Sequence, residues 1–282
     1  MGILSGLDGL GLGSLEGMDV FEEEKKEAVA PKKEAVPTVQ EKDLIYEKSF
    51  TCPVCDAEFS SKIMKTGRAK LLGTDMDLRA RYEGIDAVKY DVELCPNCGY
   101  TALSRYFSAI GSAQAKLIRD QISTKVHIGD FSGETYSYEQ AMERYKLALA
   151  CAVVKRGKTS EKAYICLKSG WLLRGWRESL QEGGKGTAAS LKELEQQEEE
   201  YLQNAYKGFL DARRTEGFPM CGMDETTIDY LLAVLAARFQ QYDVASRLTA
   251  NILASSSANA RIKEKTRELK EQILADMKKA GQ

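Results

Sequence analysis

The sequence contains two matching cysteine pairs, Cys52-Pro53-Val54-Cys55 and Cys95-Pro96-Asn97-Cys98. Each pair places two thiolates on one tight turn, and two such turns supply the four soft ligands that a tetrahedral zinc ion requires. Four protein ligands also close the coordination shell, which is typical of structural rather than catalytic zinc. We therefore expect Cys52, Cys55, Cys95 and Cys98 to hold one structural Zn²⁺ ion.

The interval between the pairs is long enough to contain a small sheet. Thirty-nine residues separate Cys55 from Cys95, against roughly 15 to 20 in a compact zinc finger. Strand-like patterns occupy residues 59–64 and 87–94, the second of which alternates apolar and charged side chains. Gly73 and Gly84 are expected in turns between strands. Gly99, just after the second pair, is expected at a positive φ angle.

A thiol redox centre is the alternative interpretation of a Cys-Pro-x-Cys sequence. In such a centre the first cysteine has a lowered pKa and attacks disulfides. It needs only one pair, at the start of a helix that follows a strand. This chain has two near-identical pairs, each after a strand-like or irregular segment, so zinc is favoured and redox chemistry is kept as the weaker alternative.

Composition limits the remaining possibilities. A chain of 282 residues with 43% apolar content can bury one large or two small cores. No apolar run approaches the roughly 20 residues of a membrane span, and the first twenty residues lack the basic leader of a secretory signal. Seven cysteines is an odd number, which favours a reducing cytoplasmic environment. Cys151, Cys166 and Cys221 are expected to be ordinary buried or partly buried side chains.

Residues 1–46 are rich in glycine, alanine, proline and charged residues, a composition that buries little surface. We expect a disordered N-terminal tail. Residues 1–21 differ from the rest of it, because large apolar side chains are interspersed among their glycines. They are a candidate docking segment that orders on a partner or on the helical region; a start without any role is the alternative.

From residue 138 onward the pattern is helical and paired. A stripe of small and larger apolar side chains lies along one face of two segments, as in the helices of a tetratricopeptide repeat. The two stripes are Ala141, Tyr145 and Ala148, and Ala245, Thr249 and Ile252. Six helices are expected, over residues 138–149, 163–176, 188–214, 228–239, 241–252 and 258–279. Such arrays offer a concave face to peptides or other proteins, which Trp171 and Trp176 could line, although packing in the core is favoured for both.

The expected fold class is α+β. A disordered tail (1–46) precedes a zinc-knuckle β domain (47–107), which is followed by connecting helices and a loop (108–137) and a tetratricopeptide-like helical domain (138–282). Residues 101–125 read as one or two helices broken near Gly111, with Ser112 as a candidate N-cap.

Catalytic motifs are weak throughout. The sole histidine, His127, has no neighbouring acid or nucleophile pattern. Asp75-Met76-Asp77 stands near Arg79 and Arg81, which favours a solvated, salt-bridged face. Residues 11–17 lack the strand that must precede a dinucleotide loop, and residues 183–187 have Gly186 where a phosphate loop needs serine or threonine. We expect no enzymatic activity.

The chain resembles the bacterial domain of unknown function 2225 family in four features. They are the two cysteine pairs, the Asp75 to Tyr82 segment, the run from Lys89 to Tyr100 and the helical second half. The resemblance covers about residues 45–280 and implies a bacterial cytosolic protein with no established activity. Our interpretation is a zinc-binding adaptor without catalytic activity. Its protein or peptide partner would bind the helical array, with a possible further contact through residues 1–21, and we expect no membrane association.

A zinc-ribbon protein that binds nucleic acid is the main alternative function. Phosphate-backbone affinity needs a surplus of lysine and arginine, yet residues 50–106 hold eight basic and eight acidic side chains. Four thiolates around one zinc ion add two further negative charges. A local basic patch over residues 62–70 is the feature that would favour nucleic acid.

We therefore predict that the purified protein gives no salt-sensitive gel shift with plain DNA or RNA at low ionic strength, because the zinc region has no excess positive charge. Electrophoretic mobility shift across a salt series is the measurement. A clear complex that weakens steeply with added salt would instead place nucleic acid first among the partners.

Overall fold

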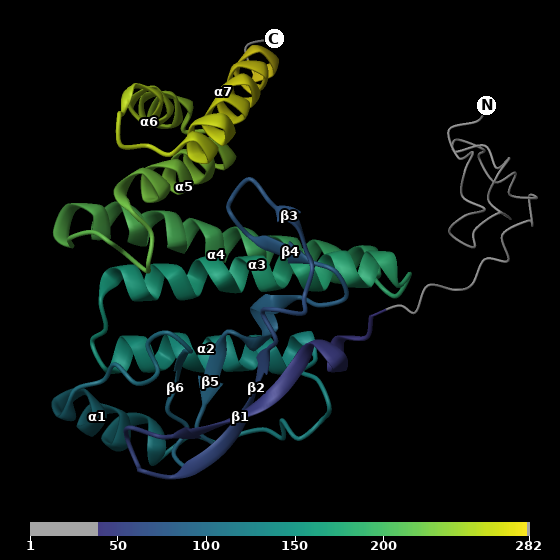
Figure 1. Ribbon diagram of the computed structural model, residues 1–282, viewed down its shortest axis with the longest axis vertical. Helices are drawn as coiled ribbons and strands as arrows, with labels where there is room; N and C mark the ends of the chain where they lie inside the picture. The colour runs from purple at the N-terminus through teal and green to yellow at the C-terminus, as the bar shows by residue number, and fades with distance from the viewer. Residues whose placement is uncertain (1–38, 281–282) are drawn as a thin grey trace, which may run out of the picture. The chain divides into compact units, whose positions relative to one another are not determined.

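The structure is a computed structural model and describes residues 39–280 (Figure 1). The architecture is α+β, as predicted: short antiparallel strands come first and helices follow. The strands are β1 (Ile45–Thr51), β2 (Glu58–Met64), β3 (Leu71–Thr74), β4 (Ala80–Tyr82), β5 (Val92–Leu94) and β6 (Thr101–Leu103). The helices are α1 (Ser112–Ile118), α2 (Tyr138–Val154), α3 (Thr159–Glu182), α4 (Ala188–Thr215), α5 (Glu225–Arg238), α6 (Tyr242–Ala254) and α7 (Ala260–Ala280). Short helical turns are η3 (Glu41–Leu44), η4 (Ala87–Tyr90) and η5 (Arg119–Ser123).

The strands form three separate antiparallel hairpins, β1–β2, β3–β4 and β5–β6. The first and third carry the cysteine pairs at their turns, and the second fills the interval between them together with η4. Gly84 adopts a positive φ angle in the turn after β4, as expected, whereas Gly73 lies inside β3 at an irregularity of the register. The predicted strand content of the interval is thus confirmed for residues 59–64, which form most of β2.

The predicted strand over residues 87–94 is wrong in its first half. Residues 87–90 form the turn η4, and only Val92–Leu94 pair as β5. The carboxylate of Asp86 accepts the N–H of Val88 at 3.1 Å and caps this turn, an alternative to strand pairing that short polar side chains offer. The alternation is also misleading about burial, since Lys89 and Glu93 are buried like their apolar neighbours.

The prediction of helices over residues 101–125 needs a similar correction. Residues 101–103 form strand β6, paired with β5, and helix begins only after Gly111. Gly111 is the N-cap of α1, and the predicted cap Ser112 is the first helical residue. The side chain of Gln114 accepts the backbone N–H of Gly111 at 3.1 Å, so a glycine without a polar side chain can begin this helix.

Six helices follow residue 138 within the described part of the chain, as the apolar periodicity predicts. Ser137 and Thr187 begin α2 and α4 with capping boxes, and Asp224 caps α5 through its carboxylate. Both predicted stripes are buried, on α2 and α6. Helices α2, α3 and α4 lie side by side and are joined by short connections (Figure 1). Their assignment to tetratricopeptide repeats stays a prediction.

The helices and the hairpins share a hydrophobic core. Val88, Val92 and Leu103 from η4, β5 and β6 belong to the same buried cluster as Tyr145 of α2, and the hydroxyl of Tyr145 donates a hydrogen bond to the carbonyl of Val88 at 3.0 Å. The proposed boundaries at residues 107 and 137 stay predictions, and of the predicted tail only residues 39–46 lie within the described range.

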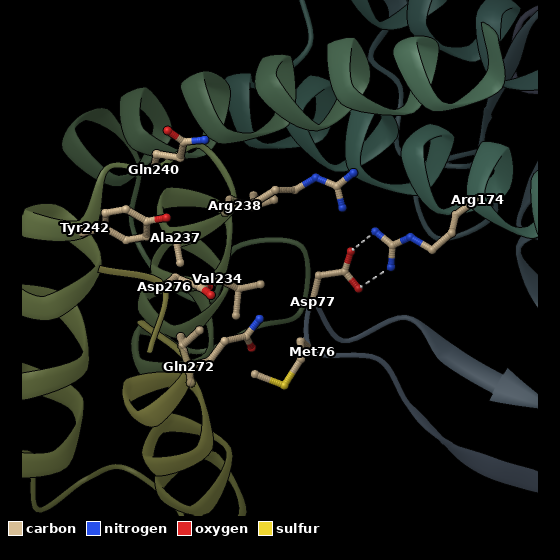
Figure 2. A pocket seen from close by; sticks show the side chains of 12 residues that line it. Met76, Asp77, Arg174, Val234, Ala237, Arg238, Gln240, Tyr242, Gln272 and Asp276 are labelled. Atoms are coloured by element: carbon tan, nitrogen blue, oxygen red, sulfur yellow. Dashed lines mark hydrogen bonds and ion pairs between the residues drawn. The ribbon is translucent and has the colours of Figure 1, made fainter. Parts of the chain in front are cut away.

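A buried ion-pair network joins the β3–β4 hairpin to α3 and α4. Glu198 of α4 is 0% exposed and contacts Arg174, Arg177 and Arg238 at 2.8, 2.9 and 3.1 Å. Arg174 also holds the carboxylate of Asp77 with both terminal nitrogens, at 3.1 and 2.6 Å (Figure 2). The expected ion pairing of this acidic segment is confirmed, but its expected solvation is wrong: Asp77 is only 4% exposed and lies in the connection between β3 and β4.

Replacing Glu198 should therefore destabilise the protein strongly. Glu198→Ala leaves three guanidinium groups around a buried site without their shared carboxylate, a change that costs about 3–5 kcal/mol of unfolding free energy. Urea denaturation followed by circular dichroism measures it. Glu195→Gln is the matched control, since Glu195 has one 3.6 Å contact with Arg177 and a 61% exposed side chain; its effect should stay below about 0.5 kcal/mol. Equal midpoints for the two variants would contradict the stabilising role.

Candidate metal centre

Two equivalent turns position the four cysteines. Cys52 directly follows β1 and Cys95 directly follows β5. In each turn the backbone carbonyl of the first cysteine accepts a hydrogen bond from the N–H four residues later. Asp56 donates to Cys52 and Gly99 donates to Cys95, both at 2.9 Å. The N–H of the first cysteine in turn donates to the carbonyl five residues on, also at 2.9 Å. Each hairpin therefore ends in the same hydrogen-bonded loop, with both cysteines on its inner side.

Both turns close through a residue with a positive φ angle. Gly99 has φ +73°, as expected from the sequence, and the equivalent position in the first turn is Asp56 with φ +58°. Aspartate tolerates this region better than most residues. At Gly99 a side chain is excluded for a second reason, because a Cβ there would lie 2.5 Å from Cγ1 of Val126.

The four sulfur atoms converge on one point. All four Sγ atoms lie within 4.8 Å of one another, and contacts of 3.6 Å join Cys52 to Cys98 and Cys55 to Cys95. A regular tetrahedron with zinc–sulfur bonds of about 2.3 Å has sulfur–sulfur edges of about 3.8 Å. The structure thus brings together every residue of the predicted ligand set, with spacings that fit a metal ion at their centre.

The close approach of these thiols changes their ionisation in opposite directions. Hydrogen bonds from the thiols of Cys52 and Cys98 lower the pKa of Cys95 to about 2. The hydrogen bond with Cys95 has the opposite effect on Cys52: it stabilises the protonated thiol and raises the pKa of Cys52 to about 12. Four thiolates at this separation repel one another, so all of them can lose their protons only around a positive ion.

Neighbouring groups orient the ligands. The N–H of Val54 points at Sγ of Cys52 at 3.5 Å, and the side-chain amide of Asn97 donates to Sγ of Cys55 at 3.4 Å. Arg119 donates to the carbonyl of Val54 at 2.7 Å and so ties the first turn to the helical turn η5. Such contacts outside the ligand set fix sulfur positions and offset part of the negative charge. Cys52, Cys95 and Cys98 are buried, and Cys55 is half-buried.

An aromatic cluster surrounds the site. Phe50 and Phe59, facing each other across β1 and β2, stack at 5.7 Å, and Phe107 packs edge-on against both. Tyr100 lies against Phe107 at 5.1 Å and donates its hydroxyl to the Phe107 carbonyl at 3.1 Å. Cys151 of α2 belongs to the same buried cluster. The hairpins are thus fixed to the helices through apolar contacts around the sulfur atoms.

The other predicted features lie elsewhere. Cys151, Cys166 and Cys221 are buried, as expected, and burial raises the pKa of Cys151 and Cys166 to about 11. His127 is exposed. Residues 183–187 connect α3 to α4, with Thr187 as the cap of α4, and residues 11–17 lie outside the described range. Asn97 and Arg119 were missed, because only the fold places an amide or a guanidinium beside a particular sulfur or carbonyl.

Another cavity lies between the β3–β4 connection and helices α5 and α7 (Figure 2). Its volume is about 330 Å³. Arg174 and Asp77 face each other at its edge, and Arg238 pairs with Glu198 and Glu199. Because these charged groups already have partners within the protein, they are not free to act on a ligand. No helix in the range 39–280 is long and apolar enough to cross a bilayer.

Comparison with known proteins assigns the family. A model of the family described as "uncharacterized protein conserved in bacteria (DUF2225)" matches residues 45–273, from the first residue of β1 into α7. The chain belongs to this family. The resemblance inferred from the cysteine pairs and the helical region is thereby confirmed. No curated protein and no solved structure matches this DUF2225 chain.

The purified protein is predicted to contain one zinc ion per chain. Cys52→Ser should lose most of it, because three thiolates bind the ion much less tightly than four. Inductively coupled plasma mass spectrometry on gel-filtered protein gives the stoichiometry. Cys166→Ser is the matched control: it removes a buried thiol outside the metal cluster and should keep a full zinc content. Wild-type protein purified without any stoichiometric metal would refute the site.

Proposed function

We propose that this protein is an adaptor with one structural zinc ion, that it binds another protein through its helical region, and that it has no catalytic activity. The observation that carries the proposal is the convergence of four cysteine sulfurs in a shell with no ligand position left for water or substrate. Zinc would join the β1–β2 and β5–β6 hairpins, which pack against α1 and α2 through apolar contacts. Binding free energies of about 10–16 kcal/mol for such sites are comparable with the stability of a whole domain.

Local contacts weigh against nucleic acid as the partner. Three of the four basic residues in the segment 62–70 have partners within the protein, and only Arg68 is exposed without an ion pair in the range 39–280. Lys62 is buried and donates to the carbonyl of Phe131 at 3.1 Å, Lys65 donates to the carbonyl of Asp43 at 3.0 Å, and Lys70 lies 3.5 Å from Glu83. Few cations are left to replace the counterions of a phosphate backbone.

The sulfur arrangement also weighs against thiol redox chemistry. A redox pair forms its disulfide within one Cys-x-x-Cys unit, at the start of a helix. Here both units follow strands, and 3.6 Å contacts join sulfurs of different units. That pattern fits four ligands of one ion better than two independent dithiols.

Substitution with cobalt tests whether the zinc is structural. Co²⁺ bound by four thiolates should give an absorption spectrum of tetrahedral sulfur coordination that is unchanged by added imidazole or cyanide, because no position is open to them. The same titration on Cys55→Ser, which opens one position, is the positive control and should change the spectrum. An exogenous ligand that binds the wild-type metal would favour a catalytic site.

The adaptor role predicts a binary protein complex. Affinity purification of the full chain from its native host, followed by reconstitution of each candidate from purified components, should yield a complex of defined stoichiometry by calorimetry. A comparison with a chain lacking residues 2–21 tests the predicted docking segment in the same experiment. Candidates that all fail to bind as purified proteins would contradict the adaptor proposal.

A further inference from the structure

A trench runs over the C-terminal half of α3, between α2 and α4. Its central cavity has a volume of about 370 Å³. Helix α2 contributes Met142 and Glu143 to its walls, α4 contributes Glu193 and Leu194, and α3 forms the floor with Trp176 and Leu180. A space of this size accommodates one or two large apolar side chains.

The trench continues beyond this cavity. Trp176, Leu180 and Glu139 also line a larger cavity of about 850 Å³, which extends towards β4 and η4. The two cavities are therefore neighbours along one surface. Their combined length from α4 to β4 suits an extended segment of another protein better than a compact small molecule.

Trp176 stands between the two cavities in a fixed orientation. Its ring stacks on the ring of Tyr138 at 6.3 Å with an interplanar angle of 5°. The predicted role of Trp176 in the core is therefore only partly correct: it is half-buried and lines the trench, whereas Trp171 is buried. Rigid aromatic side chains at the centre of a concave surface are typical anchors in protein recognition.

The floor and the rim of the trench differ in charge. Acidic groups on the floor are already neutralised, because Asp86 pairs with Arg79, and Glu178 pairs with Arg79 and Arg81, at 2.9–3.1 Å. Four glutamates on the rim are exposed and form no ion pair with any residue in the range 39–280. They are Glu139, Glu143, Glu182 and Glu193. Lys146 and Lys185 are the unpaired cations of the rim, so the free charge there is negative.

From the apolar floor and the acidic rim together we propose that the trench binds a basic segment of a partner protein, one that places a large apolar side chain against Trp176 between flanking lysines or arginines. The proposal rests on the adaptor function and adds to it the site of binding and the chemistry of the partner. The apolar anchor would supply most of the affinity, and the rim glutamates would select basic neighbours and speed association.

Three peptides of equal length test this proposal on the full-length protein. Each has two leucines at its centre, flanked on both sides by three lysines, three glutamates or three serines. Fluorescence anisotropy of the labelled peptides at low and high salt gives the affinities. We expect the lysine peptide to bind about tenfold or more tightly than the serine peptide at low salt, to lose that advantage at high salt, and the glutamate peptide to bind weakest.

Charge reversal of the rim provides the decisive comparison. Glu143→Lys combined with Glu193→Lys changes two exposed side chains on opposite walls and should reverse the preference, so that the glutamate peptide binds best. Glu268→Lys combined with Glu271→Lys on α7 is the matched control, with the same change in net charge away from the trench, and should keep the wild-type order. Circular dichroism verifies that each variant is folded.

Equal affinities of the three peptides for the wild-type protein, or an unchanged preference in the rim variant, would overturn the proposal. This failure is distinguishable from failure of the adaptor function. A reconstituted partner that binds the rim variant and the wild-type protein equally well would leave the adaptor function standing and place its interface elsewhere. Sedimentation velocity of the wild-type protein alone would show whether a second copy of the chain occupies the trench instead.

Discussion

The convergence of four cysteine sulfurs is the constraint on which the N-terminal half of this protein depends. Two hairpins whose cysteine pairs are separated by 39 residues in sequence end in the same hydrogen-bonded loop, and both loops face one point. Each of the three sheets in the range 39–280 is a single two-stranded hairpin, and isolated hairpins of that size are marginally stable in water. Mutual attachment at the sulfurs, together with the aromatic cluster of Phe50, Phe59, Tyr100 and Phe107, replaces the larger sheet that these strands do not form.

A second, electrostatic attachment fixes the remaining hairpin. The β3–β4 connection contributes Asp75 and Asp77 to a network centred on Arg174 and Glu198. Buried charges of this kind contribute little net stability compared with apolar packing, but they are costly to break one partner at a time. Such a network favours one position of the hairpin on α3 and α4, since displacing the hairpin would leave Arg174 and Glu198 without several of their partners. The hairpin in turn forms part of the wall of the trench over α3.

The sequence predicted those features that depend on local chemistry. Ligand type and spacing are encoded within four residues of each turn, so all four cysteines of the site could be predicted. Periodic apolar stripes such as Ala141, Tyr145 and Ala148 likewise indicated the helices. Features that depend on distant partners could not be predicted in this way. The three-residue strand β6 exists because it pairs with β5, and η4 forms because Asp86 caps it.

Burial of charged residues is the other feature that local patterns misrepresent. Asp77 looks like a solvated acid in sequence, and its burial follows from Arg174, which lies 97 residues further along the chain. Trp176 could be a core residue or a surface residue by periodicity alone. Its position between two cavities depends on how far α2 and α4 stand apart over α3, which is a property of tertiary packing.

Unequal burial distinguishes Cys55 from the other three cysteines of the cluster. Cys52, Cys95 and Cys98 are buried, whereas Cys55 is half-buried; its sulfur contacts Sγ of Cys95 at 3.6 Å and accepts the side-chain amide of Asn97 at 3.4 Å. A chelator or an electrophile would reach the sulfur of Cys55 more easily than the other three. Exchange of an ion held by the four sulfurs would therefore begin on the side of Cys55.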